Sequence, residues 1–186
     1  DWSSDVCSSD LAFGSIVASG PNTANPHAVP SDRVIEKGDF VLMDYGAGYC
    51  DYRSDMTRTV VMGEPTQEQR DLYALVRRTH EECVAAIHPG VEGNDIFKLS
   101  KKIIGDAGYG DYYNHGLGHG VGIDIHELPN FNRSKNTIEV GSVITMEPGV
   151  YLPGVGGVRL EDYGVVTENG YEPFTKTPHD LHVIDC

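Results

Sequence analysis

The stretch HGLGHGVGIDIHE (115–127) contains three histidines, His115, His119 and His126, among four glycines. So many glycines disfavour a stable helix, because each loses much conformational freedom on folding. Imidazole is a common metal ligand and a proton carrier near neutral pH. The stretch therefore raises the question whether these histidines bind a metal ion, and which residues would supply the other ligands.

Four carboxylates are candidates for those ligands. Asp44 lies inside the apolar run FVLMDYGA, Asp55 directly precedes MTRTVV, and Glu147 ends the run SVITME. Glu161 follows Arg159 by two residues, so in a strand both side chains point to the same face. A buried, unpaired carboxylate costs several kcal/mol. Each must therefore be paired, protonated or bound to metal, and four of them near a histidine favour a metal site.

Taken one at a time, these residues have simpler explanations. An aspartate beside a turn, such as Asp55, usually forms the turn. A single histidine is more often a core or surface group than a ligand, and Arg159 alone could be a charge at a strand edge. The metal-site prediction therefore depends on the whole set. Nucleophile-elbow, P-loop and G-x-G-x-x-G motifs are absent, and HELPN (126–130) lacks the second histidine of a zinc-protease helix.

The pattern around these residues predicts an α+β fold. A hairpin is expected from 40–45 and 56–61, followed by a helix that begins at the Thr66/Gln69 capping box and ends at Pro89-Gly90. A second helix is expected from about Asn94 to Gly108. Strand-like segments at 141–152 and 157–175, with a turn at 168–170, complete an antiparallel sheet with flanking helices.

Length and charge exclude several classes of protein. The chain has 186 residues, which suits one domain, and its net charge of -14 argues against a nucleic-acid or anionic-membrane partner. It has no apolar run of about 18 residues, so no membrane span is expected.

Residues 1–11, DWSSDVCSSDL, resemble the translation of a sequencing adapter and are set aside as non-native. Cys7 leaves the cysteine count with them. Cys50, Cys83 and Cys186 remain without C-x-x-C spacing, which favours reduced thiols in a cytoplasmic protein.

Four segments together resemble the pita-bread metallopeptidases, which include aminopeptidase P, prolidase and methionine aminopeptidase. They are NPHAVPSDR, VLMDYGAGYCDYRSDMTRT, HGLGHGVGIDIHELP and ITMEPGVYLPGVGGVRLED. The resemblance runs from about Ala12 to the end of the chain. It implies that 12–186 is a partial catalytic domain of the pita-bread fold, truncated at its N-terminus.

The resemblance also implies a centre with two divalent metal ions. Its ligands would be Asp44, Asp55, His119, Glu147 and Glu161, with Asp55 and Glu161 bridging the ions. This oxygen-rich set favours Mn²⁺, with Fe²⁺, Co²⁺ and Zn²⁺ as alternatives.

Other residues would serve the substrate. The resemblance implies that His27, His115 and His126 contact the peptide, and that His126 helps to stabilise the oxyanion. Glu147 would also carry the proton from water to the departing nitrogen. Arg159 would shape the pocket for proline or hold the ligands in place.

Within the family, His115 and the arginine of VRLED favour cleavage of Xaa-Pro bonds over the methionine aminopeptidase reaction. The expected partners are peptides with proline at the second position, and the full-length protein is expected to be a homodimer. Aminopeptidase P and Xaa-Pro dipeptidase both remain open. The alternatives are a methionine aminopeptidase-like enzyme and a pita-bread module that binds peptides or proteins without hydrolysis.

Overall fold

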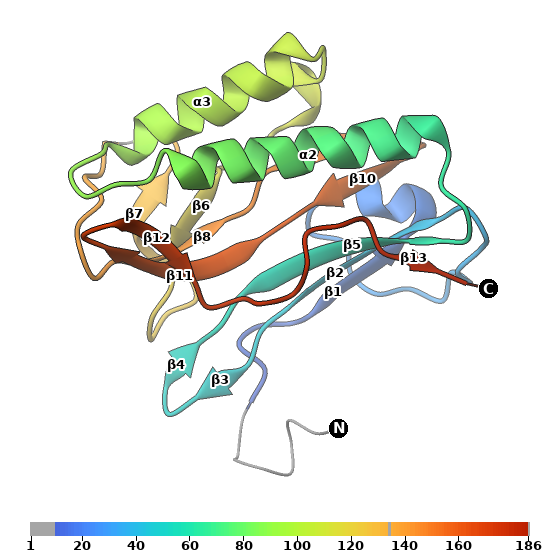
Figure 1. The fold of residues 1–186 in the computed structure, drawn as a ribbon. Coiled ribbons are helices and arrows are strands. Elements are labelled where there is room, and N and C mark those ends of the chain that lie inside the picture. Colours follow the sequence, from blue (N-terminus) through green and yellow to red (C-terminus); the bar gives the residue numbers. More distant parts are fainter. Residues whose placement is uncertain (1–9, 134, 186) are drawn as a thin grey trace.

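Two helices lie side by side over one face of a set of β-strands (Figure 1). The computed structural model describes residues 10–133 and 135–185. The helices are α2 (Gln67–Ala85) and α3 (Gly93–Asp106), and two short 3₁₀ turns are η1 (Gly20–Ala24) and η2 (Gly110–Tyr112). Cys7, Cys186 and residues 1–9 of the segment set aside as non-native lie outside the described residues.

The first sheet has the strand order β1-β2-β5-β13. Its strands are β1 (Ile16–Ser19), β2 (Phe40–Tyr45), β5 (Met56–Met62) and β13 (Val183–Ile184). The predicted hairpin is β2 and β5, and its loop folds into the small ribbon β3 (Gly48–Tyr49) and β4 (Tyr52–Arg53). The strands pair antiparallel as predicted, except at one edge, where β13 pairs parallel to β5. Parallel strands need a long connection between them. The segment between β5 and β13 provides one, because it contains both helices and the whole second sheet.

The second sheet has the order β12-β11-β8-β6-β7. Its strands are β6 (Gly118–Gly120), β7 (Glu127–Phe131), β8 (Val143–Met146), β11 (Asp162–Thr167) and β12 (Gly170–Pro173). A separate ribbon joins β9 (Gly149–Leu152) to β10 (Gly156–Arg159). The predicted run 141–152 is thus broken between β8 and β9. Pro148 explains the break, since it has no N–H to donate to a neighbouring strand.

The first helix begins as predicted and ends earlier. The Thr66 hydroxyl accepts from the Gln69 N–H, and the Gln69 side chain accepts from the Thr66 N–H, which completes the capping box. The helix stops at Ala85, four residues before Pro89. Proline has no N–H to reach the Ala85 carbonyl, and it disfavours a helical conformation at the residue before it. Its effect therefore extends back by one turn.

The core lies between the helices and the strands. Alternate residues along a strand point either into this core or to the opposite face of the sheet. Val158 and Leu160 are fully buried in the cluster that contains Leu72 and Val76 of α2. Arg159 and Glu161, which alternate with them, line a cavity instead. The helices therefore stabilise the sheet from one face and leave the other face for chemistry.

Two further expectations concern the surface and the cysteines. Within the described residues, neither helix has both the length and the apolar composition to cross a membrane. Cys50 and Cys83 are free thiols. Asp10 and Leu11 contact residues 47 and 48 through backbone pairing, and the assignment of 1–11 as non-native stays a prediction.

Candidate metal centre

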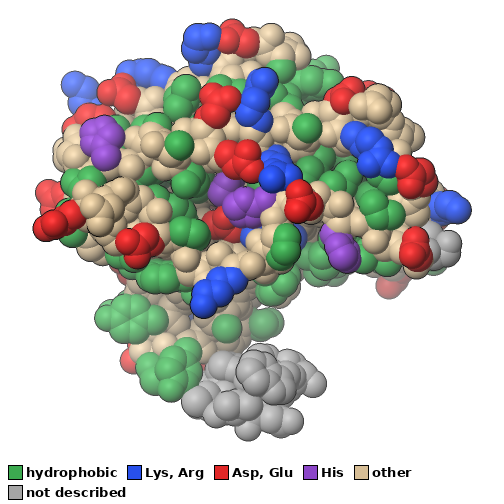
Figure 2. All heavy atoms as spheres, viewed as in Figure 1, with side chains coloured by type: hydrophobic (Ala, Val, Ile, Leu, Met, Phe, Trp, Pro, Cys, Tyr) green, Lys and Arg blue, Asp and Glu red, His purple; other side chains and the backbone are tan. Residues whose placement is uncertain are grey.

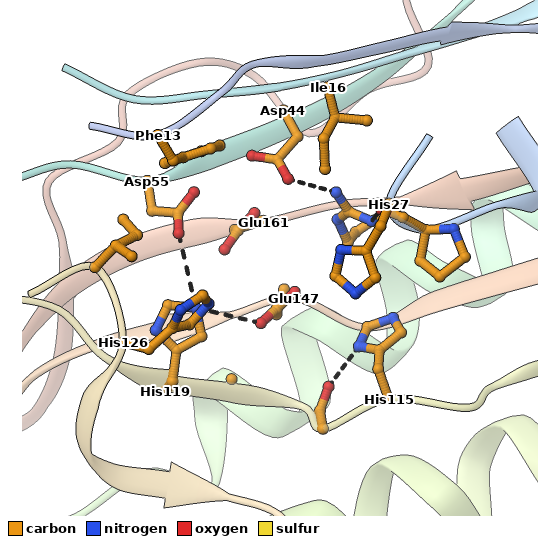
Figure 3. Close-up of a pocket in the computed structure, with 15 residues that line it drawn as sticks. Phe13, Ile16, His27, Asp44, Asp55, His115, His119, His126, Glu147 and Glu161 are labelled. Atoms are coloured by element: carbon orange, nitrogen blue, oxygen red, sulfur yellow. Dashed lines mark hydrogen bonds and ion pairs between the residues drawn. The ribbon is translucent and has the colours of Figure 1, made fainter. Parts of the chain in front are cut away.

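All nine predicted site residues line a single cavity of about 290 Å³. They come from both sheets and from the loops that join them, and their side chains point toward one another (Figure 3). The nine are His27, Asp44, Asp55, His115, His119, His126, Glu147, Arg159 and Glu161. The structure therefore brings together residues from four distant segments of the sequence.

The proposed ligands converge on one side of this cavity. The Nε2 atom of His119 lies 3.7 Å from Oδ2 of Asp55 and 3.6 Å from Oε1 of Glu147. Ligand atoms of Asp55, His119 and Glu161 all lie within 4.8 Å of one another. Asp44 is next to them in the same cavity, because β2 and β5 pair with Asp44 opposite Thr57.

The donor atoms of this group fit a divalent cation. Oδ1 of Asp44 and Oδ1 of Asp55 are buried and have no hydrogen-bond partner in the part of the chain that the structure describes. Buried carboxylate oxygens are normally hydrogen-bonded or bound to metal. Four carboxylates and one imidazole form an oxygen-rich set, which suits Mn²⁺ and similar ions.

Without a cation, the pKa values of all four carboxylates are raised above their usual range. Burial, then repulsion by Asp44 and Glu147, raises the pKa of Asp55 to about 8. Burial raises the pKa of Glu147 to about 7 and that of Glu161 well above its usual value. Burial also raises the pKa of Asp44, although Arg159 opposes the shift. Such shifts in one cavity are typical of a functional site.

His119 is held in the form that binds metal. Its Nδ1 lies 3.0 Å from the Gly120 carbonyl oxygen, so that nitrogen carries the proton and donates it to the carbonyl. Nε2 is then left with a lone pair that faces the carboxylates. Burial lowers the pKa of His119 to about 4, which keeps the ring neutral. Its backbone N–H donates to the Thr145 hydroxyl at 3.0 Å.

Arg159 connects the acidic side of the cavity to the opposite wall. One NH2 group donates to Oδ2 of Asp44 at 2.6 Å, and Nε donates to the Thr57 hydroxyl at 3.0 Å. The Thr57 hydroxyl in turn donates to Oε2 of Glu161 at 2.6 Å. The arginine is buried and therefore fixes two predicted ligands, Asp44 directly and Glu161 through Thr57. A role as a strand-edge charge is excluded.

The remaining histidines lie around the same cavity at different depths. His115 is partly buried, and burial followed by the charge of Arg159 lowers its pKa to about 4. His27 and His126 are exposed residues of the lining. The His126 ring packs edge-on against His119, with centroids 4.3 Å apart. All three are positioned to meet a molecule that enters the cavity.

A family model, Metallopeptidase family M24, matches residues 4–168. The chain belongs to this family. It is 47% identical over 171 residues to an Xaa-Pro dipeptidase of Pyrococcus furiosus, and 42% identical over 174 residues to one of Lactobacillus delbrueckii subsp. lactis. These alignments cover 91% and 93% of this chain, but only 49% and 47% of the relatives. The chain thus spans about half the length of the curated relatives it matches.

Solved structures of the M24 family share the fold. An X-Pro aminopeptidase from Thermotoga maritima MSB8 superposes with a TM-score of 0.91 at 37% identity, over 94% of this chain and 50% of that one. The prolidase from Pyrococcus horikoshii OT3 gives 0.90 at 44% identity, over 92% and 50%. A His350Ala aminopeptidase P of Escherichia coli gives 0.81 at 28% identity, over 89% and 44%. The predicted α+β pita-bread fold is confirmed.

The M24 site has one further residue that sequence reasoning missed. Tyr151 of β9 accepts from NH1 of Arg159 at 3.0 Å and donates to Nε2 of His115 at 2.8 Å. His115 then donates from Nδ1 to the Gly116 carbonyl at 2.6 Å. The sequence signal that could have pointed to Tyr151 is the pair of glycines at 149 and 157, which leave room for its side chain. A Cβ at Gly149 would lie 2.5 Å from the Tyr151 hydroxyl, and one at Gly157 would lie 2.8 Å from its ring.

Replacing Tyr151 with phenylalanine should destabilise this M24 domain without changing its fold. The change leaves NH1 of Arg159 and Nε2 of His115 each without one buried partner, at a cost of about 1–3 kcal/mol. Urea unfolding monitored by circular dichroism measures the difference. Tyr112→Phe is the matched control, because Tyr112 is 41% exposed, and it should stay within about 0.5 kcal/mol of wild type. Equal stability of both variants would contradict the role of the Tyr151 hydroxyl.

Proposed function

We propose that the protein to which this chain belongs is a metallo-exopeptidase that hydrolyses Xaa-Pro bonds at the N-terminus of peptides or in dipeptides. The observation that carries this proposal is the meeting of four carboxylates, three of them buried, and one neutral imidazole in a single cavity. The names of the relatives, Xaa-Pro dipeptidase, X-Pro aminopeptidase and prolidase, support the choice of substrate.

In this proposal Asp44, Asp55, His119, Glu147 and Glu161 hold two divalent ions. When bound, the ions supply a water of lowered pKa and polarise the scissile carbonyl. Glu147 takes the proton of the attacking water and returns it to the departing nitrogen.

The other side chains bind and orient the peptide. His115 presents a ring fixed by Tyr151 and Gly116 to the cavity. His126 donates to the carbonyl oxygen as negative charge develops there. His27, at the exposed rim, contacts the peptide as it enters. Arg159 keeps Asp44 in place through its 2.6 Å ion pair.

We further propose Mn²⁺ as the metal, since all but one of the proposed ligands are carboxylates. The working protein is proposed to be a cytoplasmic homodimer. The free thiols of Cys50 and Cys83 agree with a reducing compartment.

A substrate comparison tests the proposal. The chain is stripped with a chelator, reloaded with Mn²⁺ and incubated with Ala-Pro, Ala-Pro-Ala-Ala and Met-Ala-Ala, and products are identified by mass spectrometry. We expect release of alanine from at least one proline peptide and none after chelation. Cleavage of Ala-Pro alone identifies a dipeptidase, and cleavage of the longer peptide an aminopeptidase.

Two other outcomes would overturn the proposal. Cleavage confined to Met-Ala-Ala would assign a methionine aminopeptidase-like activity. The second outcome is that none of the peptides is cleaved although calorimetry shows two Mn²⁺ ions bound per folded chain. That result would favour a binding module.

A further inference from the structure

A second cluster of histidine and aspartate lies on the other side of the strand segment that carries Glu161. It contains His80 of α2, Asp162 at the start of β11, and His179 from the segment between β12 and β13. Ligand atoms of the three lie within 4.8 Å of one another. None of the three lines the cavity of the metal centre. Asp162 follows Glu161 directly, so its side chain points to the opposite face.

His80 is the residue in this cluster that lacks a partner. Its side chain is only 2% exposed, yet neither ring nitrogen has a hydrogen-bond partner among the described residues. Buried polar atoms without partners are rare, since each costs its full desolvation free energy. The Nε2 atom lies 3.4 Å from Oδ2 of Asp162, without the geometry of a hydrogen bond. A cation between these atoms would satisfy the nitrogen.

The spacing of the three groups suits a tetrahedral zinc ion. Zinc bonds to nitrogen and oxygen of about 2.0–2.1 Å place two tetrahedral ligands about 3.3 Å apart. The His80 to Asp162 separation already has nearly this value. Nε2 of His179 lies 2.6 Å from Oδ2 of Asp162, so this pair would open slightly on binding. His179 is 28% exposed, which leaves a path for the ion and for a water as the fourth ligand.

Charges around the cluster allow a cation to bind. Arg58 is the nearest positive group, and it is paired with the other carboxylate oxygen, Oδ1 of Asp162, at 2.6 Å. Oδ2, which pairs with Nε2 of His179, faces the imidazoles. At His80 the charges of Asp162 and Glu81 favour positive charge, whereas Arg58 opposes it. On the face of the molecule drawn in Figure 2, histidine side chains are exposed among acidic and basic ones.

We propose that His80, Asp162 and His179 form a Zn²⁺ site that is separate from the peptidase centre. Two imidazoles and one carboxylate favour Zn²⁺ over Mn²⁺, whereas the oxygen-rich cavity favours Mn²⁺. The ion would tie the C-terminal segment to α2 and β11. That segment already contacts α2 through the 2.6 Å ion pair of Arg77 with Asp180. The proposal does not depend on the peptidase function.

Zinc binding to matched variants tests the site. Equilibrium dialysis against Zn²⁺ is compared for wild type, the double variant His80→Gln/His179→Asn, and the control His88→Gln/His182→Asn, which changes two exposed histidines. We expect the first double variant to bind one Zn²⁺ fewer than wild type and the control to bind the same number. At 100-fold excess over Kd, the zinc-induced rise in Tm should be smaller by roughly 5 °C or more in the first double variant.

A direct measurement on wild type guards against a variant that does not fold. Ring ¹⁵N resonances of His80 and His179 should shift on addition of Zn²⁺, because one nitrogen of each ring becomes a ligand. Unchanged resonances at zinc saturation would overturn the site and leave a hydrogen-bonded cluster. An unchanged zinc content in a folded double variant would overturn it equally.

Discussion

Glu147→Gln should lower kcat for Xaa-Pro hydrolysis by a factor of about 10²–10⁴, the usual contribution of a general acid–base group. Glutamine keeps the size of the side chain but cannot carry the proton, and it removes a negative charge 3.6 Å from Nε2 of His119. Because KM depends on groups that contact the peptide, it should change far less than kcat. Steady-state rates for the Mn²⁺-loaded variant, with the metal content measured, give both constants.

Glu172→Gln is the control for this experiment. Glu172 is an exposed residue of β12 far from the cavity lining, so the same chemical change there should leave kcat within twofold of wild type, about 0.4 kcal/mol of barrier. A Glu147→Gln variant that binds Mn²⁺ normally and retains full kcat would remove the carboxylate from the proton-transfer role. Loss of Mn²⁺ with loss of activity would instead assign the effect to its role as a ligand.

The metal-free chain should lose stability between pH 6.5 and pH 8. Asp55 and Glu147 have pKa values raised to about 8 and about 7, so the folded state holds protons that the unfolded state has released. Their stabilising contribution is therefore complete below the unfolded values near 4 and is lost as pH rises through the folded values. Across the stated window the two carboxylates should lose roughly 2 kcal/mol, since one pKa unit corresponds to about 1.4 kcal/mol, and buried histidines offset about half of that loss.

Three histidines oppose this effect at the lower end of the window. Burial lowers the pKa of His80, His115 and His119 to about 4, so their contribution to stability rises with pH from about 4 to about 7.5 and opposes that of the carboxylates. At pH 6.5 these histidines are neutral in the folded state but still about half protonated in the unfolded state. Only above about pH 7.5 does the carboxylate effect act alone.

Calorimetry of chelated protein at pH 6.5 and pH 8 measures this effect as a fall in Tm of several degrees. Mn²⁺ should reverse the sign, because the ion competes with protons for the same oxygens and binds better at pH 8. Asp55→Asn should flatten the metal-free dependence, since it removes a group with a strongly raised pKa. A metal-free Tm that is equal or higher at pH 8 would contradict the raised pKa values.

The site could be predicted from sequence because its chemistry is unusual for the places where its residues occur. Asp44 lies in an apolar strand and Glu147 at the end of another. A carboxylate at such a place must be paired, protonated or bound to metal, so these two residues stand out before the fold is known. The histidines among glycines raised the question of a metal ion, and the resemblance to the pita-bread metallopeptidases singled out His119 as the nitrogen ligand. The motifs that carry this resemblance are local, so they can be read without knowledge of the fold.

The features that the sequence did not reveal depend on distant contacts. Tyr151 looks like an ordinary strand residue until Gly157, across the ribbon, leaves room for its ring. Thr57 gains its role only because Glu161 pairs with it across two sheets. The cluster of His80, Asp162 and His179 joins a helix, a strand and the C-terminal segment. No pattern within one element predicts such meetings.

The hydrogen bond between Thr57 and Glu161 joins residues that are far apart in the sequence, and this separation limits when the chain can bind the proposed metal ions. These residues are 104 positions apart in the sequence. A nascent chain that has emerged only as far as its second helix has Asp44 and Asp55 but no histidine or glutamate to complete the centre. Contacts of such long range form late in folding, because the intervening loop must close first. Metal uptake at the proposed centre would thus be a closing step of biogenesis, and tight binding would report a chain that has finished folding.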